Sequence, residues 1–109
     1  MSFDSFGLSA QILEAVVAKG FENPTPVQTQ TVPLLLTENT DLIALAGTGT
    51  GKTAAFGLPL LQKLDPALKE VQAVILCPTR ELCLQITNEI QSFAVNMPKT
   101  WILAVYGGS

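Results

Sequence analysis

The chain has 109 residues, of which 48% are hydrophobic and 14% are charged. This length and composition allow at most one domain with a packed core, and they exclude a largely disordered chain. Six basic and nine acidic residues give a net charge of −3, so the composition by itself gives no indication of a nucleic-acid partner.

The sequence gives little indication of a membrane protein or of a metal-binding protein. The longest apolar runs, such as 42–46, are far too short to cross a bilayer, and the N-terminus lacks the regions of a signal peptide, so we expect a cytoplasmic protein. Cys77 and Cys83 have poor spacing for zinc ligands, and the chain has no histidine. We expect both cysteines to be small buried hydrophobic residues in a reducing compartment.

Two helices are predicted near the N-terminus. The first covers residues 9–19, with Ser9 as its N-cap and Gly20 as the left-handed residue that closes it. The second runs from Thr25 to about residue 37, with a proline at its first helical position.

Gln28 follows the N-cap Thr25 by three residues, the spacing of a capping box. The pattern leaves this structural role and a ligand-binding role equally open.

Three apolar runs predict strands, at about 41–46, 73–77 and 101–106. Helices are predicted between them, at 52–64 and at about 80–94. The run 73–77 is continuous, as in strands that are buried on both faces of a parallel sheet.

Two predicted helices contain an internal proline. Pro33 predicts a kink or an early break in the second helix, and Pro59 predicts an interruption of the helix that begins at residue 52.

The alternation of helices and strands predicts an α/β fold with a parallel sheet and flanking helices. Three nearly all-apolar strands would leave an open edge, so the sheet would be incomplete. We therefore expect residues 1–109 to be the N-terminal part of a longer protein.

A predicted strand, a glycine-rich loop and a helix follow one another over residues 42–64, which is the order of a phosphate-binding P-loop. Glycines let backbone N–H groups turn toward a polyphosphate, Lys52 can reach the outer phosphates, and Thr53 can offer a hydroxyl to Mg²⁺. The strict pattern has glycine where this chain has Ala46. The alternative is a glycine-rich turn with a solvated lysine.

Several stretches together resemble the DEAD-box RNA helicases of superfamily 2, in the form found in bacteria. In order and spacing they look like the Q motif, motif I, motif Ia and the Gly-Gly motif of that family, and Ala46 is what its motif I has. The stretches are Phe3, Gly20-Phe21, 24–28, 46–53, 78–85 and Gly107-Gly108.

The resemblance implies an ATP site with Mg²⁺, in a P-loop NTPase domain of the RecA-like type. Gln28 would read the adenine edge and Phe21 would stack on the base, with ordinary core packing as the alternative for the aromatic residues. Lys52 and Thr53 would serve catalysis, and Thr53 would ligate Mg²⁺. The implied ATP-binding residues are Phe3, Phe21, Gln28, Ala46, Gly47, Thr48, Gly49, Thr50, Gly51, Lys52 and Thr53.

The resemblance also implies contacts with the sugar-phosphate backbone of RNA, single-stranded or in a short duplex, without sequence preference. The alternative for the charged member of this group, Arg80, is a surface residue paired with a nearby carboxylate. The implied RNA-binding residues are Pro78, Thr79, Arg80, Gly107 and Gly108.

The chain also departs from the family. Gly47 stands where the family usually has a larger polar residue or proline, which would loosen the loop and alter nucleotide affinity. The Asp-Glu-Ala-Asp motif and the second RecA-like domain with its arginine finger do not occur in residues 1–109. We therefore expect the full protein to unwind RNA and the 109-residue chain alone to be inactive.

Two other interpretations stay open: another P-loop NTPase, such as a nucleotide kinase, or a nucleotide-binding fragment without turnover.

Overall fold

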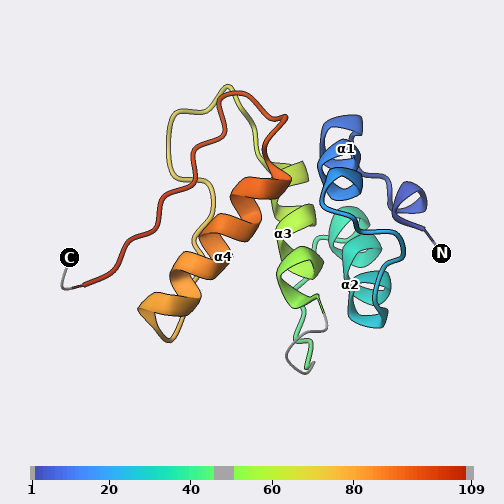
Figure 1. Ribbon diagram of the computed structural model, residues 1–109, viewed down its shortest axis with the longest axis horizontal. Helices are drawn as coiled ribbons and strands as arrows, with labels where there is room; N and C mark the ends of the chain where they lie inside the picture. Colours follow the sequence, from blue (N-terminus) through green and yellow to red (C-terminus); the bar gives the residue numbers. More distant parts are fainter. Residues whose placement is uncertain (1, 46–50, 108–109) are drawn as a thin grey trace.

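The computed structural model describes residues 2–45 and 51–107. These residues form one short 3-10 helix followed by α-helices, and α3 lies between α2 and α4 (Figure 1). The elements are η1 (Phe3–Phe6), α1 (Ala10–Ala18), α2 (Pro26–Thr37), α3 (Lys52–Lys63) and α4 (Arg80–Phe93). In the described part of the chain, no helix has the length and hydropathy that a membrane span requires.

The four predicted helices are confirmed, and local capping explains where they start and end. The Ser9 hydroxyl accepts a hydrogen bond from the Ile12 N–H at 3.4 Å, at the start of α1. Gly20 follows the C-terminus of α1 with φ +84°, in the left-handed region that glycine adopts without strain. The Thr79 hydroxyl caps α4 by accepting from the Leu82 N–H at 3.2 Å.

Neither internal proline ends its helix. The interruption predicted at Pro59 was therefore wrong, and so was an early break at Pro33, whereas a kink at Pro33 stays a prediction. α2 continues through Pro33, and α3 continues through Pro59. A proline inside a helix removes one backbone hydrogen bond and crowds the preceding turn, but tertiary packing can outweigh that cost. Pro59 is among the fully buried side chains of the core, and this burial is the physical reason that α3 tolerates it.

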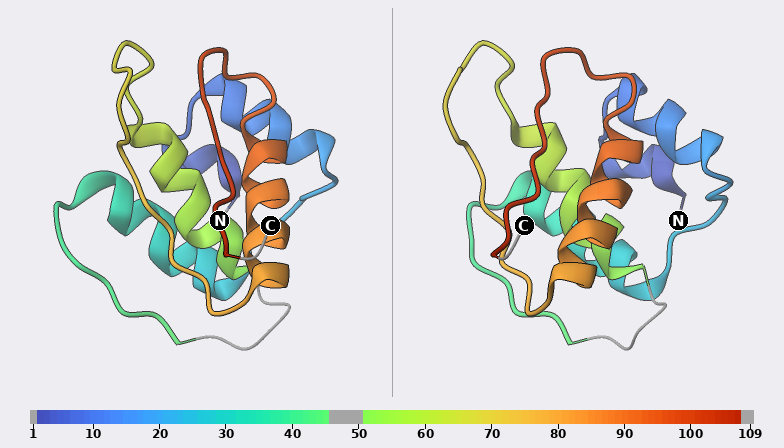
Figure 2. Two further views of the ribbon diagram at one scale, coloured as in Figure 1. Left: turned by 90° about the vertical axis from the view of Figure 1, so that its left-hand side faces the viewer. Right: turned by 60° about the vertical axis from the view of Figure 1, so that its left-hand side comes forward.

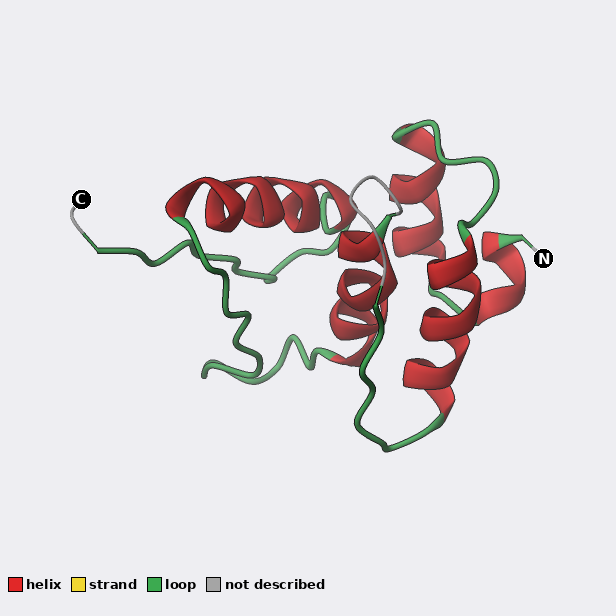
Figure 3. Ribbon diagram, turned by 90° about the horizontal axis from the view of Figure 1, so that it is seen from below, coloured by secondary structure: helices red, strands yellow, loops and turns green. Residues whose placement is uncertain are grey.

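The predicted sheet is also absent from the described residues, which contain no strand (Figure 3). Residues 41–45, 73–77 and 101–106 are extended but form no ladder with each other, and a strand is defined by its hydrogen-bonded neighbours. Burial of 73–77 on both faces was wrong as well, because Val74 is 74% exposed and Leu76 is 91% exposed.

The extended residues 101–106 nevertheless keep the alternation of a strand. Ile102, Ala104 and Tyr106 are half-buried, whereas Trp101, Leu103 and Val105 are exposed. The Gln91 amide donates to the Ile102 carbonyl at 3.2 Å, which places this run against α4. Only one face of the segment is therefore covered.

Helices and extended segments run in opposite directions. In both orientations of Figure 2, as in Figure 1, α2, α3 and α4 begin near the same end of the molecule, and the three extended segments run toward that end. Residues that follow an extended segment and open a helix therefore gather at one end. In α/β folds this is where ligands bind.

The core is formed mainly by the helices. α3 occupies its centre, and Leu58 and Leu61 of this helix are fully buried. The cluster of buried apolar residues comprises Phe3, Phe6, Leu8, Ile12, Val16, Val32, Ala54, Leu58, Leu61, Ile90 and Phe93.

Gln28 fixes the junction between α2 and α3. Its side-chain oxygen accepts from the Thr25 N–H at 3.1 Å, and the Thr25 hydroxyl accepts from the Gln28 N–H at 3.5 Å, so the predicted capping box is confirmed. The Gln28 amide nitrogen also donates to the Gly51 carbonyl at 3.1 Å, immediately before α3. The side chain is only 2% exposed, so it ties the two helices together inside the protein.

Replacing Gly51 with alanine is expected to lower the free energy of unfolding by about 1–3 kcal/mol. Gly51 has φ +83°, and a Cβ atom there would collide with the Gln28 amide. Urea denaturation of the 109-residue chain, followed by circular dichroism, measures the change.

Gly57→Ala in α3 is the matched control. A Cβ atom at Gly57 would meet Ile90 Cγ1 at 3.4 Å, an ordinary contact, and alanine has the better helix propensity. Stability should stay the same or rise by up to about 1 kcal/mol. Equal effects of the two substitutions would contradict the role given to Gly51.

Candidate functional site

The described part of the predicted phosphate loop is its end, residues 51–53; Ala46, Gly47, Thr48, Gly49 and Thr50 lie outside the described residues. Gly51 is the N-cap of α3 and provides no side-chain cap to that helix. The first N–H groups of a helix need partners, and an anion can supply them. Lys52 is exposed and Thr53 is half-buried at this helix start, so a cation, a hydroxyl and backbone donors lie together there.

A cavity of about 1360 Å³ adjoins this helix start. Gly51, Lys52 and Thr53 line it, together with residues of α2 and α4 and with Lys19 at the end of α1. Gln28 and Phe21 are not among its lining residues. The structure therefore places Gly51, Lys52 and Thr53 beside open space, whereas it holds the predicted adenine residues Gln28 and Phe21 in packing contacts.

The aromatic residues predicted for the adenine pocket lie against one another. The Phe21 ring is 6.2 Å from the Phe3 ring, measured between centroids, and 5.7 Å from the Phe93 ring, which it meets edge to face. Phe3 is only 4% exposed, whereas Phe21 is half-buried. Of the two, Phe21 has the more accessible ring, and its stacking on adenine stays a prediction.

The predicted RNA-binding residues come from two distant parts of the sequence, and the structure brings them together. The Arg80 guanidinium donates from Nη2 to the Gly107 carbonyl at 2.9 Å and lies 5.0 Å from the centroid of the Tyr106 ring. Pro78, Thr79 and Arg80 are all exposed. The partner of Arg80 in the described residues is thus a carbonyl and an aromatic ring rather than a carboxylate. Gly108 lies outside the described residues.

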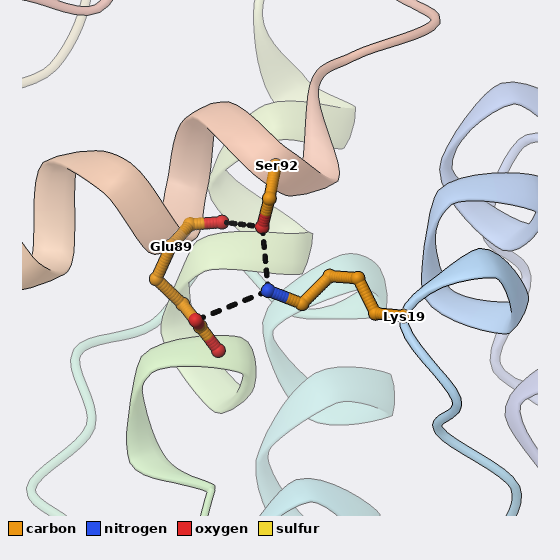
Figure 4. Close-up of polar contacts among 3 residues, drawn as sticks. All are labelled: Lys19, Glu89 and Ser92. Atoms are coloured by element: carbon orange, nitrogen blue, oxygen red, sulfur yellow. Dashed lines mark hydrogen bonds and ion pairs between the residues drawn. The ribbon is translucent and has the colours of Figure 1, made fainter.

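Two residues at the site were not identified from the sequence. Tyr106 contacts the Arg80 guanidinium, and its position just before Gly107 is the only signal that could have pointed to it. Lys19 forms hydrogen bonds with Glu89 and Ser92 of α4 (Figure 4). Its partners follow it by 70 and 73 residues, so no local pattern could have revealed the contact.

The cysteines are half-buried free thiols rather than fully buried residues, which corrects the expectation. Burial and the neighbouring Cys83 thiol raise the pKa of Cys77 above its ordinary value, so this thiol is protonated at neutral pH and is a poor nucleophile. Among the described residues, no three histidine, cysteine, aspartate or glutamate side chains form a group that could hold a metal ion.

Several known proteins are similar to this chain in sequence or in structure. The chain is 50% identical over 107 residues to the "ATP-dependent RNA helicase CshA" of Listeria monocytogenes, and the match covers 98% of this chain and 20% of that protein. The crystal structure of a DEAD box protein from the hyperthermophile Methanococcus jannaschii has a TM-score of 0.91 and 41% identity, over 100% of this chain and 30% of that one.

A structure of S. cerevisiae Dbp5 bound to RNA and ADP BeF3 has a TM-score of 0.84 and 37% identity, over 88% of this chain and 25% of that one. The chain spans about a fifth of the length of the Listeria relative. Residues 25–109 match the family described as DEAD/DEAH box helicase. On these grounds, the chain belongs to the DEAD/DEAH box helicase family.

Proposed function

We propose that residues 1–109 are the N-terminal part of the first RecA-like domain of an ATP-dependent RNA helicase, with its Q motif at residues 3–28. One observation carries the proposal most strongly: the start of α3, with Lys52 and Thr53, and the start of α4, with Arg80, lie near the same end of the molecule (Figure 1). The names of the relatives support it, since the Listeria protein is called an ATP-dependent RNA helicase and the Dbp5 structure contains RNA and ADP BeF3.

The start of α3 would bind the phosphates of ATP. The exposed ammonium of Lys52 would neutralise phosphate charge, and the first N–H groups of the helix would donate to phosphate oxygens. The Thr53 hydroxyl is an oxygen donor of the kind that Mg²⁺ prefers, so the residues present fit one ligand of that ion. When bound, Mg²⁺ would supply further neutralisation of the phosphates.

Gln28 can serve both as a capping residue and as a reader of adenine. A primary amide has two N–H donors and an oxygen with two lone pairs, and the contacts with Thr25 and Gly51 use one of each. One donor and one acceptor remain, which match the N7 acceptor and the N6 donor of adenine. Because Gln28 is 2% exposed, the base would have to displace the atoms that now cover this edge.

The start of α4 would bind the RNA backbone. Arg80 offers a planar guanidinium to a phosphate, and the exposed residues Thr79 and Gly107 lie beside it. Contacts of this kind position a strand but carry no sequence information, so we infer sequence-independent binding of single-stranded RNA or of a short duplex.

The complete protein would couple ATP hydrolysis to local separation of RNA strands. Residues 1–109 contain neither an Asp-Glu-Ala-Asp sequence nor a second RecA-like domain, so we infer that this segment alone does not turn over ATP. The cytoplasm, where ATP and structured RNA are present, is the compartment that suits this activity.

Lys52→Ala in the full-length gene product should weaken ATP binding at least about tenfold, because a charge-assisted contact to phosphate contributes about 1.5–3 kcal/mol. Equilibrium binding of ATP measures the effect. Lys63→Ala changes an exposed lysine at the other end of α3 and should leave the affinity unchanged. If the Lys52 variant and the unmodified protein bind ATP with equal affinity, the assignment of the start of α3 to the phosphate site is wrong.

Arg80→Ala should weaken RNA binding, and the slope of log affinity against log salt should decrease by about 1, as expected for the loss of one phosphate contact. Binding of a single-stranded oligonucleotide across a salt series gives the slope. Lys69→Ala removes an exposed cation that is not among the proposed RNA-binding residues and serves as the control. A lower affinity with an unchanged slope would mean that Arg80 acts on the fold rather than on a phosphate.

A further inference from the structure

Lys19 is the C-cap of α1, two residues before Phe21, and backbone hydrogen bonds follow it directly. The Gly20 N–H donates to the Val17 carbonyl at 2.9 Å, and the Phe21 N–H donates to the Val16 carbonyl at 3.2 Å. These two bonds form a Schellman motif, with Gly20 in the left-handed conformation. The motif fixes the backbone of Phe21 but leaves its side-chain torsions to be set by other contacts.

The ammonium group of Lys19 lies near two aromatic rings. Its nitrogen is 4.7 Å from the centroid of the Phe93 ring and 5.8 Å from that of the Phe21 ring. Both distances are within the range of cation–π attraction, which reaches to about 6 Å. The cation is therefore close enough to be attracted to both rings, which also make an edge-to-face contact with each other.

Two side chains of α4 hold the ammonium group in this position (Figure 4). Lys19 Nζ lies 3.1 Å from the Glu89 carboxylate and 2.6 Å from the Ser92 hydroxyl oxygen. The Ser92 hydroxyl donates to the Glu89 carbonyl, so its lone pairs face the lysine. The Lys19 side chain is 23% exposed and that of Glu89 is 37% exposed, so this pair is more sheltered than an ordinary surface ion pair.

We propose that Lys19 is a positioning residue for nucleotide binding. Held by Glu89 and Ser92, its ammonium group keeps the Phe21 ring in the orientation that receives the adenine base. The inference rests on the proposed role of Phe21 as the stacking residue. A ring that is already ordered loses less conformational entropy when the base binds, so affinity depends on the lysine although it does not touch the nucleotide.

Lys19→Met tests this role in the full-length gene product, because methionine keeps an apolar stem and removes the cation. We expect the KM for ATP in RNA-stimulated hydrolysis to rise about two- to fivefold, the effect of losing one cation–π contact, with kcat unchanged. Lys19→Arg retains the cation and should restore the KM. Lys63→Met makes the same chemical change at an exposed site on α3 and should have no effect.

A double-mutant cycle with Phe21→Leu separates this inference from the proposed function. If Lys19 acts through the ring, Phe21→Leu raises the KM and Lys19→Met adds nothing to it. A KM unaffected by Phe21→Leu would overturn the stacking role and the inference together. If Phe21→Leu raises the KM while Lys19→Met leaves it unchanged or adds independently, only the inference is overturned.

A second pair of variants covers the case in which Lys19→Met does not fold. Ser92→Ala and Glu89→Gln each remove one group that holds the ammonium, and neither changes the lysine. Each should raise the KM for ATP in the same direction and leave kcat unchanged. Variants that lose thermal stability but keep the KM would show that the cluster only joins α1 to α4, and this would overturn the inference.

Discussion

The hydrogen bond from the Gln28 amide to the Gly51 carbonyl is the contact on which the candidate site depends. It joins the capped start of α2 to the residue that precedes α3, and the absence of a side chain at Gly51 leaves room for the amide. The direction of the first N–H groups of α3 is therefore set from α2. In the proposed site, the side chain that reads the base also holds the helix that binds the phosphates.

The helices form most of the packed core, because the extended segments are covered on one side only. Leu58, Leu61 and Phe93 are fully buried between helices, whereas every second residue of 101–106 faces outward. The chain still superimposes on the Methanococcus protein with a TM-score of 0.91. The described residues thus keep the family's arrangement of helices although they contain no hydrogen-bonded ladder.

Features that depend on neighbours in the sequence were predictable, and features that depend on distant residues were not. Thr25 and Gln28 form their capping box within four residues, so composition and spacing revealed it. The apolar run 101–106 predicted a strand, but the partner that would make it one is not encoded in those six residues. From the local sequence, Pro59 was expected to interrupt its helix. The burial that stabilises it there depends on core residues elsewhere in the chain, so it could not be predicted locally. Lys19 showed no signal because Glu89 lies 70 residues away.

α4 carries residues that belong to both proposed sites, the RNA site at its start and the surroundings of Phe21 near its end. Arg80, at its first residue, contacts Gly107 and Tyr106, whereas Glu89, Ser92 and Phe93, near its end, surround the ammonium group of Lys19. A helix of 14 residues is about 21 Å long at 1.5 Å per residue. In the proposed function, one helix thus presents a residue for RNA at its start and, near its end, the groups that hold Lys19 beside Phe21.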